Sequence, residues 1–218
     1  MISGAIFDID GTILDSMQFW AKAPEPFLNN IGIELAPEVG KLTLFMGLPE
    51  IADFLKKEYR LDMSVDAIIE GITETIKDYY KYQVQLKEGA ERFLTDMKQA
   101  GMKITAATFS ERYNVENALK RLNALKYFDI ILTCTEVGAG KEKPDVYLAA
   151  ARYMGTLPMH TWVFEDALYA LKTAKNAGFK TVGVYDVSSI EDQPEIKKAC
   201  DIYLEKLDGV DICNFIFF

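Results

Sequence analysis

The chain has 218 residues, half of them hydrophobic, and its 33 acidic and 24 basic residues give a formal net charge of −9. This size and composition fit one globular domain, or one domain that carries an insertion. The acidic balance argues against a general basic face for nucleic acid, and no apolar run approaches the length of a membrane span. We therefore expect neither nucleic acid nor a membrane as a partner.

The expected location is cytoplasmic. The three cysteines are odd in number and widely spaced, which fits a reducing compartment better than a disulfide framework. The first residues lead directly into a predicted strand, without the basic and apolar regions of a signal peptide.

The most informative stretch lies near the N-terminus, where the apolar run Ala5-Ile6-Phe7 gives way to Asp8 and Asp10. The run predicts a strand buried on both faces. Because side chains alternate along a strand, the two carboxylates should leave it pointing the same way. Gly11 then frees the backbone to turn. Two adjacent carboxylates repel, so this stretch requires a shared proton or a cation, unless the aspartates merely cap backbone amides in an acidic turn.

Residues 17–84 show helical periodicity and no convincing strand. Apolar positions recur at helical spacing between Ile51 and Tyr59 and between Val65 and Tyr80. Ser64 is a plausible N-cap of the second helix. We interpret this segment as an inserted helical domain.

From residue 88 onward, strands alternate with helices, as in a parallel sheet with helices on both faces. The strands are expected at residues 103–108, 128–132, 161–164, 180–185 and 202–204. Ser110 is expected to cap the following helix and Pro144 to occupy the first position of another. The predicted class is therefore α/β: a Rossmann-like core of residues 1–15 and 86–218, and a helical cap of residues 16–85. The apolar residues 215–218 are expected to pack on the core or on a partner.

Polar residues follow four of the predicted strands, and the carboxyl ends of parallel strands meet at one edge of a sheet. They are Asp8, Asp10, Thr108, Lys141, Glu165 and Asp166. The carboxylates suit Mg²⁺, which would also relieve their repulsion. The Thr108 hydroxyl and the next amides can hold phosphoryl oxygens, and Lys141 can balance their charge. Taken one at a time, Thr108 could equally be an ordinary strand-end hydroxyl, Lys141 a loop lysine and Asp166 the N-cap of its helix.

These motifs resemble those of the haloacid dehalogenase superfamily of phosphohydrolases, over the whole chain and in the same order. The stretch Asp8-Ile9-Asp10-Gly11-Thr12 is similar to the family's first motif, D-x-D-G-T. Thr108 matches the second motif, Lys141 the third, and Val163-Phe164-Glu165-Asp166 the fourth. A helical insertion directly after the first motif is typical of the subgroup that includes β-phosphoglucomutase and phosphoglycolate phosphatase.

The resemblance implies a mechanism in which Asp8 attacks phosphorus and Asp10 carries the protons. It implies that Mg²⁺ is bound by Asp8, the main-chain oxygen of Asp10 and Asp166, with Glu165 nearby. The substrate, a small phosphorylated metabolite, would then contact residues of two strand-end loops and of the cap. These substrate-binding candidates are Gly11, Thr12, Phe109, Ser110, Trp20 and Glu50.

Three departures from the family pattern affect the predicted activity. Relatives often have K-P-x-P-D after the third-motif lysine, but this chain has K-E-K-P-D, so Lys143 rivals Lys141. Trp20 stands where β-phosphoglucomutases typically have a histidine, and Glu50 stands where they have a cap arginine. A plain phosphatase is favoured, with a phosphomutase and a non-catalytic phospholigand-binding module as alternatives. We expect a monomer or a weak homodimer.

Overall fold

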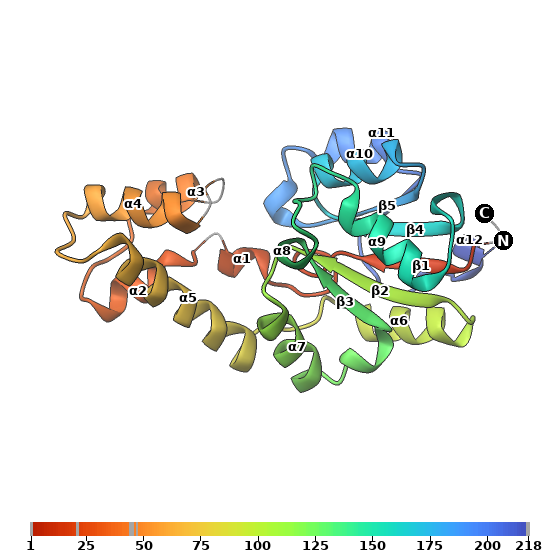
Figure 1. Cartoon of the computed structure of the whole chain (residues 1–218), viewed down its shortest axis with the longest axis horizontal. Coiled ribbons are helices and arrows are strands. Elements are labelled where there is room, and N and C mark those ends of the chain that lie inside the picture. Colours follow the sequence, from red (N-terminus) through yellow and green to blue (C-terminus); the bar gives the residue numbers. More distant parts are fainter. Residues whose placement is uncertain (1, 21, 44–45, 47, 217–218) are drawn as a thin grey trace. The chain divides into compact units, whose positions relative to one another are not determined.

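The computed structural model of the protein describes residues 2–20, 22–43, 46 and 48–216. The chain forms two compact units. One comprises Met1–Asp15 and Val84–Phe218, and the other comprises Ser16–Gln83. Each unit is described by itself (Figure 1).

The larger unit is built on a six-stranded sheet in the order β3-β2-β1-β4-β5-β6, and every neighbouring pair is parallel. The strands are β1 (Gly4–Phe7), β2 (Lys103–Thr108), β3 (Ile130–Thr133), β4 (Thr161–Glu165), β5 (Lys180–Val184) and β6 (Ile202–Leu204). The first strand in the sequence therefore lies in the middle of the sheet. This architecture confirms the predicted α/β class.

Alternation along the central strands gives the sheet two apolar faces. On one face the Phe7 ring stacks on Phe164 at 4.2 Å between centroids, and Phe93 of α6 (Ala90–Gln99) packs edge-on against both. On the other face Ile6 and Val163 join a core with residues of α9 (Asp145–Met154) and α10 (Leu168–Asn176). Helices thus cover both faces, as Figure 1 shows.

The remaining α-helices of this unit are α7 (Arg112–Arg121), α8 (Cys134–Val137), α11 (Gln193–Ala199) and α12 (Cys213–Ile216). Phe215 of α12 is fully buried against Phe93, Phe164 and Trp162, which supports the expected packing of the apolar C-terminal segment on the core. Residues 217 and 218 lie outside the described residues.

Several predicted boundaries were wrong by one or two residues, among them the starts of β3 and α9 and the ends of β3, β4 and β5. Strand β3 begins at Ile130 rather than at residue 128, because Phe128 packs edge-on against Phe7 and the Asp129 carboxylate accepts the Ile104 N–H at 2.9 Å. Pro144 is the N-cap of α9 rather than its first residue.

The smaller unit contains only helices among its described residues. They are α1 (Met17–Trp20), α2 (Pro24–Asn30), α3 (Pro37–Thr43), α4 (Leu48–Glu58) and α5 (Val65–Tyr82). The predicted N-cap of α5 is confirmed, since Ser64 Oγ accepts the Ala67 N–H at 3.1 Å. Every fourth residue from Ile68 to Tyr80 is buried on one face of this helix. In the described part of the chain no helix combines the length and apolarity needed to cross a membrane.

Candidate active site

The candidate site lies where the connections leave the two central strands in opposite directions. Strand β1 has β2 on one side and β4 on the other, so the order of the sheet reverses between β1 and β4. Open α/β sheets bind ligands at such a switch point. Asp8 follows β1 and continues the ladder by donating its N–H to Phe164 O at 3.0 Å, while β4 ends at Glu165.

Three buried carboxylates meet at this switch point. Asp8, Glu165 and Asp166 each offer an oxygen, and these oxygens lie within 4.8 Å of one another. Burial raises the pKa of Asp8 well above its ordinary value, and burial together with repulsion from Glu165 and Asp186 raises the pKa of Asp166 to about 8. A hard divalent cation suits such a set of oxygens and would favour their ionised forms. The residues therefore fit Mg²⁺.

Lys141 is the positive charge inside this group. Its ammonium pairs with Asp8 Oδ1 and, at 2.7 Å, with Glu165 Oε1. Burial would lower its pKa, but the two facing carboxylates reverse that effect and raise the pKa above its ordinary value. Lys143, the rival in the sequence, is exposed. The geometry thus favours Lys141 as the lysine of the site.

Tyr147 of α9 belongs to the same buried network, although the sequence did not single it out. Its hydroxyl donates to Glu165 Oε1 at 2.6 Å, so Glu165 is held by both Tyr147 and Lys141. Burial, with the Glu165 charge beside it, raises the pKa of this phenol above its ordinary value. In the sequence Tyr147 is one residue of an apolar helix face, and nothing in that pattern indicates where the hydroxyl points.

The loop after β2 holds the second aspartate of the first motif. Ser110 Oγ donates to Asp10 Oδ2 at 2.6 Å, and the Ser110 N–H donates to Thr108 Oγ1 at 3.0 Å. The prediction that Ser110 caps the next helix was wrong. Helix α7 begins at Arg112 and its N-cap is Glu111, because the Ser110 hydroxyl is engaged by Asp10 instead. The Asp10 side chain is outside the group of three carboxylates, and coordination of a metal by its main-chain oxygen stays a prediction.

The turn after Asp10 is tight. The Ile13 and Leu14 N–H groups both donate to Ile9 O, at 2.9 and 2.8 Å, and Gly11 has φ +80°, which a side chain would strain. Thr12 Oγ1 is fully buried and has no hydrogen-bond partner in the described part of the protein. A buried hydroxyl without a partner is costly. This cost is consistent with the prediction that Gly11 and Thr12 contact a ligand.

A second, largely buried ion pair lies close to Asp166. Lys87 Nζ lies 2.8 Å from Asp186 Oδ2, and Asp186 is close enough to Asp166 to raise its pKa. Asp186 is the second residue after β5, at the same edge of the sheet as the other acids. The rule that pointed to the other strand ends could therefore have found it, but the set considered from the sequence ended at the fourth strand.

Three further residues were predicted to contact the substrate. Phe109 is half exposed, in the loop between Thr108 and Ser110. In the smaller unit, Trp20 Nε1 donates to Tyr80 Oη at 2.9 Å, and Glu50 is exposed in the first turn of α4. A substrate-facing role for any of the three stays a prediction.

Comparisons with known proteins agree with the fold and with the motifs. A family model for haloacid dehalogenase-like hydrolases matches residues 5–184. The chain is 25% identical over 212 residues to a phosphorylated carbohydrates phosphatase of Thermotoga maritima, with 96% of each protein covered. It is 29% identical over 188 residues to a fructose-1-phosphate phosphatase of Escherichia coli, covering 84% of this chain and 96% of that protein.

A solved structure shows the same fold. A Thermotoga maritima protein provisionally assigned as a β-phosphoglucomutase superposes with a TM-score of 0.85, at 23% identity and with 95% of each chain covered. Together with the family match over most of its length, this shows that the chain belongs to the haloacid dehalogenase-like hydrolase family.

Proposed function

We propose that the protein is a Mg²⁺-dependent phosphatase that hydrolyses a small phosphomonoester, such as a sugar phosphate, through an aspartyl-phosphate. The observation that carries the proposal is the placement of Lys141 between Asp8 and Glu165, with Asp166 beside them. A buried lysine and three converging carboxylates suit an anionic phosphoryl group only when further positive charge is available. Mg²⁺, held by Asp8, Asp166 and the Asp10 main-chain oxygen with Glu165 nearby, would supply that charge when bound.

In the proposed first step, a carboxylate oxygen of Asp8 attacks phosphorus and a new phosphorus–oxygen bond forms. The bond between phosphorus and the leaving-group oxygen breaks, and Asp10 gives its proton to that oxygen. Lys141 balances the charge of the phosphoryl oxygens. Ser110 holds Asp10 Oδ2 and so fixes the rotation of the carboxyl group that transfers the proton.

In the second step, Asp10, now a carboxylate, accepts a proton from water. The water oxygen attacks phosphorus, the bond to Asp8 breaks, and inorganic phosphate leaves. Asp8 and Asp10 return to their starting forms, so atoms and protons balance over the cycle.

The helical residues 16–85 are proposed to select the substrate, with Trp20 and Glu50 as specificity residues. The names of two relatives, a phosphatase of phosphorylated carbohydrates and a fructose-1-phosphate phosphatase, support a sugar phosphate as the substrate class. A phosphomutase is the second candidate, since a fold neighbour has that assignment. Two departures from the mutase pattern favour hydrolysis. Trp20 replaces the histidine typical of β-phosphoglucomutases, and the acidic Glu50 would oppose a second phosphate.

Phosphate release from p-nitrophenyl phosphate tests the proposal. We expect activity with Mg²⁺, none with EDTA, and a loss of at least about 10³-fold in Asp8→Asn, because the nucleophile is gone. Asp192→Asn is the matched control, an exposed aspartate of the same unit. Full activity in Asp8→Asn would exclude the mechanism. No activity on a broad panel of phosphate esters would favour the binding module, and interconversion of hexose phosphates with little phosphate release would favour the mutase.

A further inference from the structure

Two charged side chains stand just beyond the neighbouring ends of strands β2 and β3. Thr108 and Thr133 are partners in the sheet register, so the two strands end side by side. Arg112, the first residue of α7, comes four residues after Thr108. Glu136, on the short helix α8, comes three residues after Thr133.

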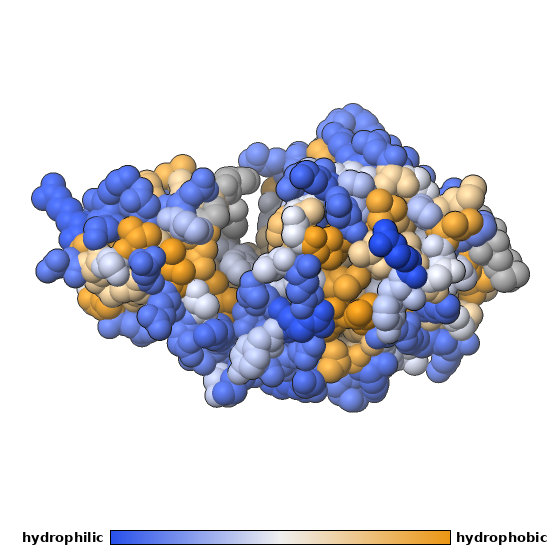
Figure 2. Space-filling model, viewed as in Figure 1, coloured by the Kyte–Doolittle hydropathy of each residue, from blue (hydrophilic) through white to orange (hydrophobic). Residues whose placement is uncertain are grey.

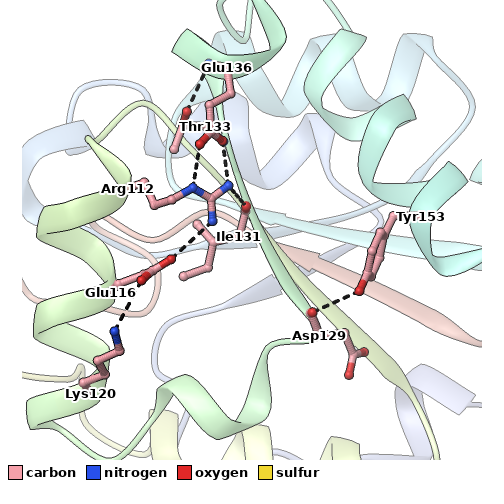
Figure 3. Close-up of polar contacts among 8 residues, drawn as sticks. All are labelled: Arg112, Glu116, Lys120, Asp129, Ile131, Thr133, Glu136 and Tyr153. Carbon is pink, nitrogen blue, oxygen red and sulfur yellow. Dashed lines mark hydrogen bonds and ion pairs between the residues drawn. The ribbon is translucent and has the colours of Figure 1, made fainter.

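Arg112 and Glu136 form a two-point ion pair between these ends (Figure 3). Arg112 Nε lies 2.5 Å from Glu136 Oε1, and Arg112 Nη2 lies 2.7 Å from Glu136 Oε2. Arg112 Nη2 also donates to Ile131 O of β3 at 2.5 Å. A planar guanidinium that meets a carboxylate at two points fixes orientation as well as distance.

The partner carboxylate is itself fixed to its own strand. Glu136 Oε2 accepts the Thr133 N–H at 3.2 Å and Thr133 Oγ1 accepts the Glu136 N–H at 3.1 Å, which is a complete capping box. The hydrogen bond from Arg112 lowers the pKa of Glu136 to about 2, so the carboxylate is ionised at neutral pH. Arg112 therefore binds a rigid acceptor.

Each residue of this ion pair lies close in the sequence to a residue that contacts a candidate catalytic aspartate. Ser110, whose hydroxyl holds Asp10, stands two residues before Arg112. On the other side only residues 138–140 separate α8 from Lys141, which holds Asp8. This connection is short, and it turns at Gly138, whose φ of +77° a side chain would strain.

We propose that the Arg112–Glu136 ion pair is a positioning device that sets the loop after β2, whose Ser110 holds Asp10, against the loop after β3, whose Lys141 holds Asp8. The inference deepens the proposed phosphatase function and rests on it. Neither residue needs to touch the substrate. The ion pair keeps Ser110, which holds the proton carrier Asp10, at a fixed distance from Lys141. The loops after β2 and β3 have no covalent link close to the site that could do so.

The rest of the charged network provides a matched control. Glu116 Oε1 lies 3.3 Å from Arg112 Nη1 and its Oε2 lies 3.4 Å from Lys120 Nζ, and all three residues are on α7. Glu116→Gln therefore removes an ion pair from the same arginine without touching the connection between the loops. Figure 3 shows this difference, since Glu116 and Lys120 extend along α7 while Glu136 lies beyond β3.

The test compares kcat/KM, measured in the presence of Mg²⁺, for two substrates, p-nitrophenyl phosphate and glycerol phosphate. Nitrophenolate leaves without a proton, whereas an alkoxide needs one from Asp10. For Arg112→Gln and Glu136→Gln we expect losses of about 10-fold on the nitrophenyl ester and about 100-fold on the alkyl ester. The double variant should lose no more than either single variant, and Glu116→Gln should stay within about twofold of the wild type.

Equal losses on the two esters, or losses as large in Glu116→Gln, would overturn the positioning role and leave only a structural one. The ratio of the kcat/KM values for the two esters does not depend on the fraction of folded protein, so a change in this ratio indicates misplacement and not misfolding. Thermal unfolding of each variant measures the folded fraction separately. If the wild type is inactive on both esters, the proposed function fails. Titration with inorganic phosphate in the presence of Mg²⁺ then still tests the device: weaker binding in Arg112→Gln than in Glu116→Gln supports it, and equal binding overturns it.

Discussion

Two groups of charged residues in the α/β unit both pair carboxylates with a cationic side chain, but the carboxyl pKa values shift in opposite directions. Asp8, Lys141, Glu165 and Asp166 are almost fully buried, whereas Arg112, Glu116 and Glu136 are partly open to solvent. In the buried group desolvation prevails and raises the pKa values of Asp8 and Asp166. In the open group hydrogen bonds prevail and lower the pKa of Glu136 to about 2.

The difference separates a site that needs a ligand from a scaffold that does not. The buried group has three carboxylates and one lysine, so part of its negative charge requires a proton or a cation. The Glu136 carboxylate is satisfied by Arg112 and the Thr133 N–H without any added ion. We infer that the partly open pair holds its geometry whether or not the buried group is filled. Figure 2 shows that hydrophilic and hydrophobic residues intermix over the visible surface of the α/β unit.

The largest effect is expected from Lys141→Met, which removes the one cationic side chain, among the residues that the structure describes, that pairs with both Asp8 and Glu165. Breaking a buried ion pair from one side costs about 3–5 kcal/mol, and phosphatase activity should fall by at least about 10³-fold. Urea unfolding and p-nitrophenyl phosphate turnover measure the two effects. Lys143→Met, at the exposed lysine, should change neither; an equal loss there would reassign the lysine of the site.

Tyr147→Phe should have the next largest effect on stability. It removes one hydrogen bond to a buried carboxylate that keeps its contact with Lys141, at a cost of about 1–3 kcal/mol in the free energy of unfolding. Tyr153→Phe is the control, because this exposed phenol donates to Asp129 O at 3.2 Å in partly solvated surroundings. If both variants unfold at the same urea concentration, burial is not what makes the Tyr147 hydrogen bond important.

Glu136→Gln should change the pH dependence of stability. A carboxylate whose pKa is lowered on folding stabilises the protein fully above its unfolded value, near pH 4.5, and loses that contribution as the pH falls toward 2. The variant should therefore be less stable than the wild type at pH 7, and the difference should shrink below pH 4.5. Free energies of unfolding at pH 7, 4.5 and 3 measure it, and a difference that is constant with pH would contradict the assigned role of the Arg112 hydrogen bond.

The smallest effect is expected from Lys120→Ala. Lys120 pairs with Glu116 at 3.4 Å with 60% of its side chain exposed, and such surface pairs contribute about 0–1 kcal/mol. Thermal unfolding at low and high salt measures it. A salt-dependent loss larger than that of Glu136→Gln would show that the partly open network depends on Lys120 more than on the ion pair between the loops.

Much of the fold could be predicted from local patterns. Apolar runs such as Ala5-Ile6-Phe7 identify buried strands, and the helical spacing from Val65 to Tyr80 identifies α5. The rule that parallel strands end at one edge then placed Asp8, Lys141, Glu165 and Asp166 together, although they are as many as 158 positions apart in the sequence. The boundaries at residue 128 and at Pro144 were less certain, because neighbours in space decide where a strand or helix begins.

The sequence by itself determined the class of the fold and the types of residue at the candidate site, because periodicity and strand ends are local properties. Only the tertiary structure decided which partner each of those residues contacts. It places Lys141 rather than Lys143 against Asp8, engages Ser110 with Asp10 instead of a helix end, and brings Tyr147 to Glu165. These contacts join distant segments, and their geometry depends on how the helices pack on the sheet, which no local pattern specifies.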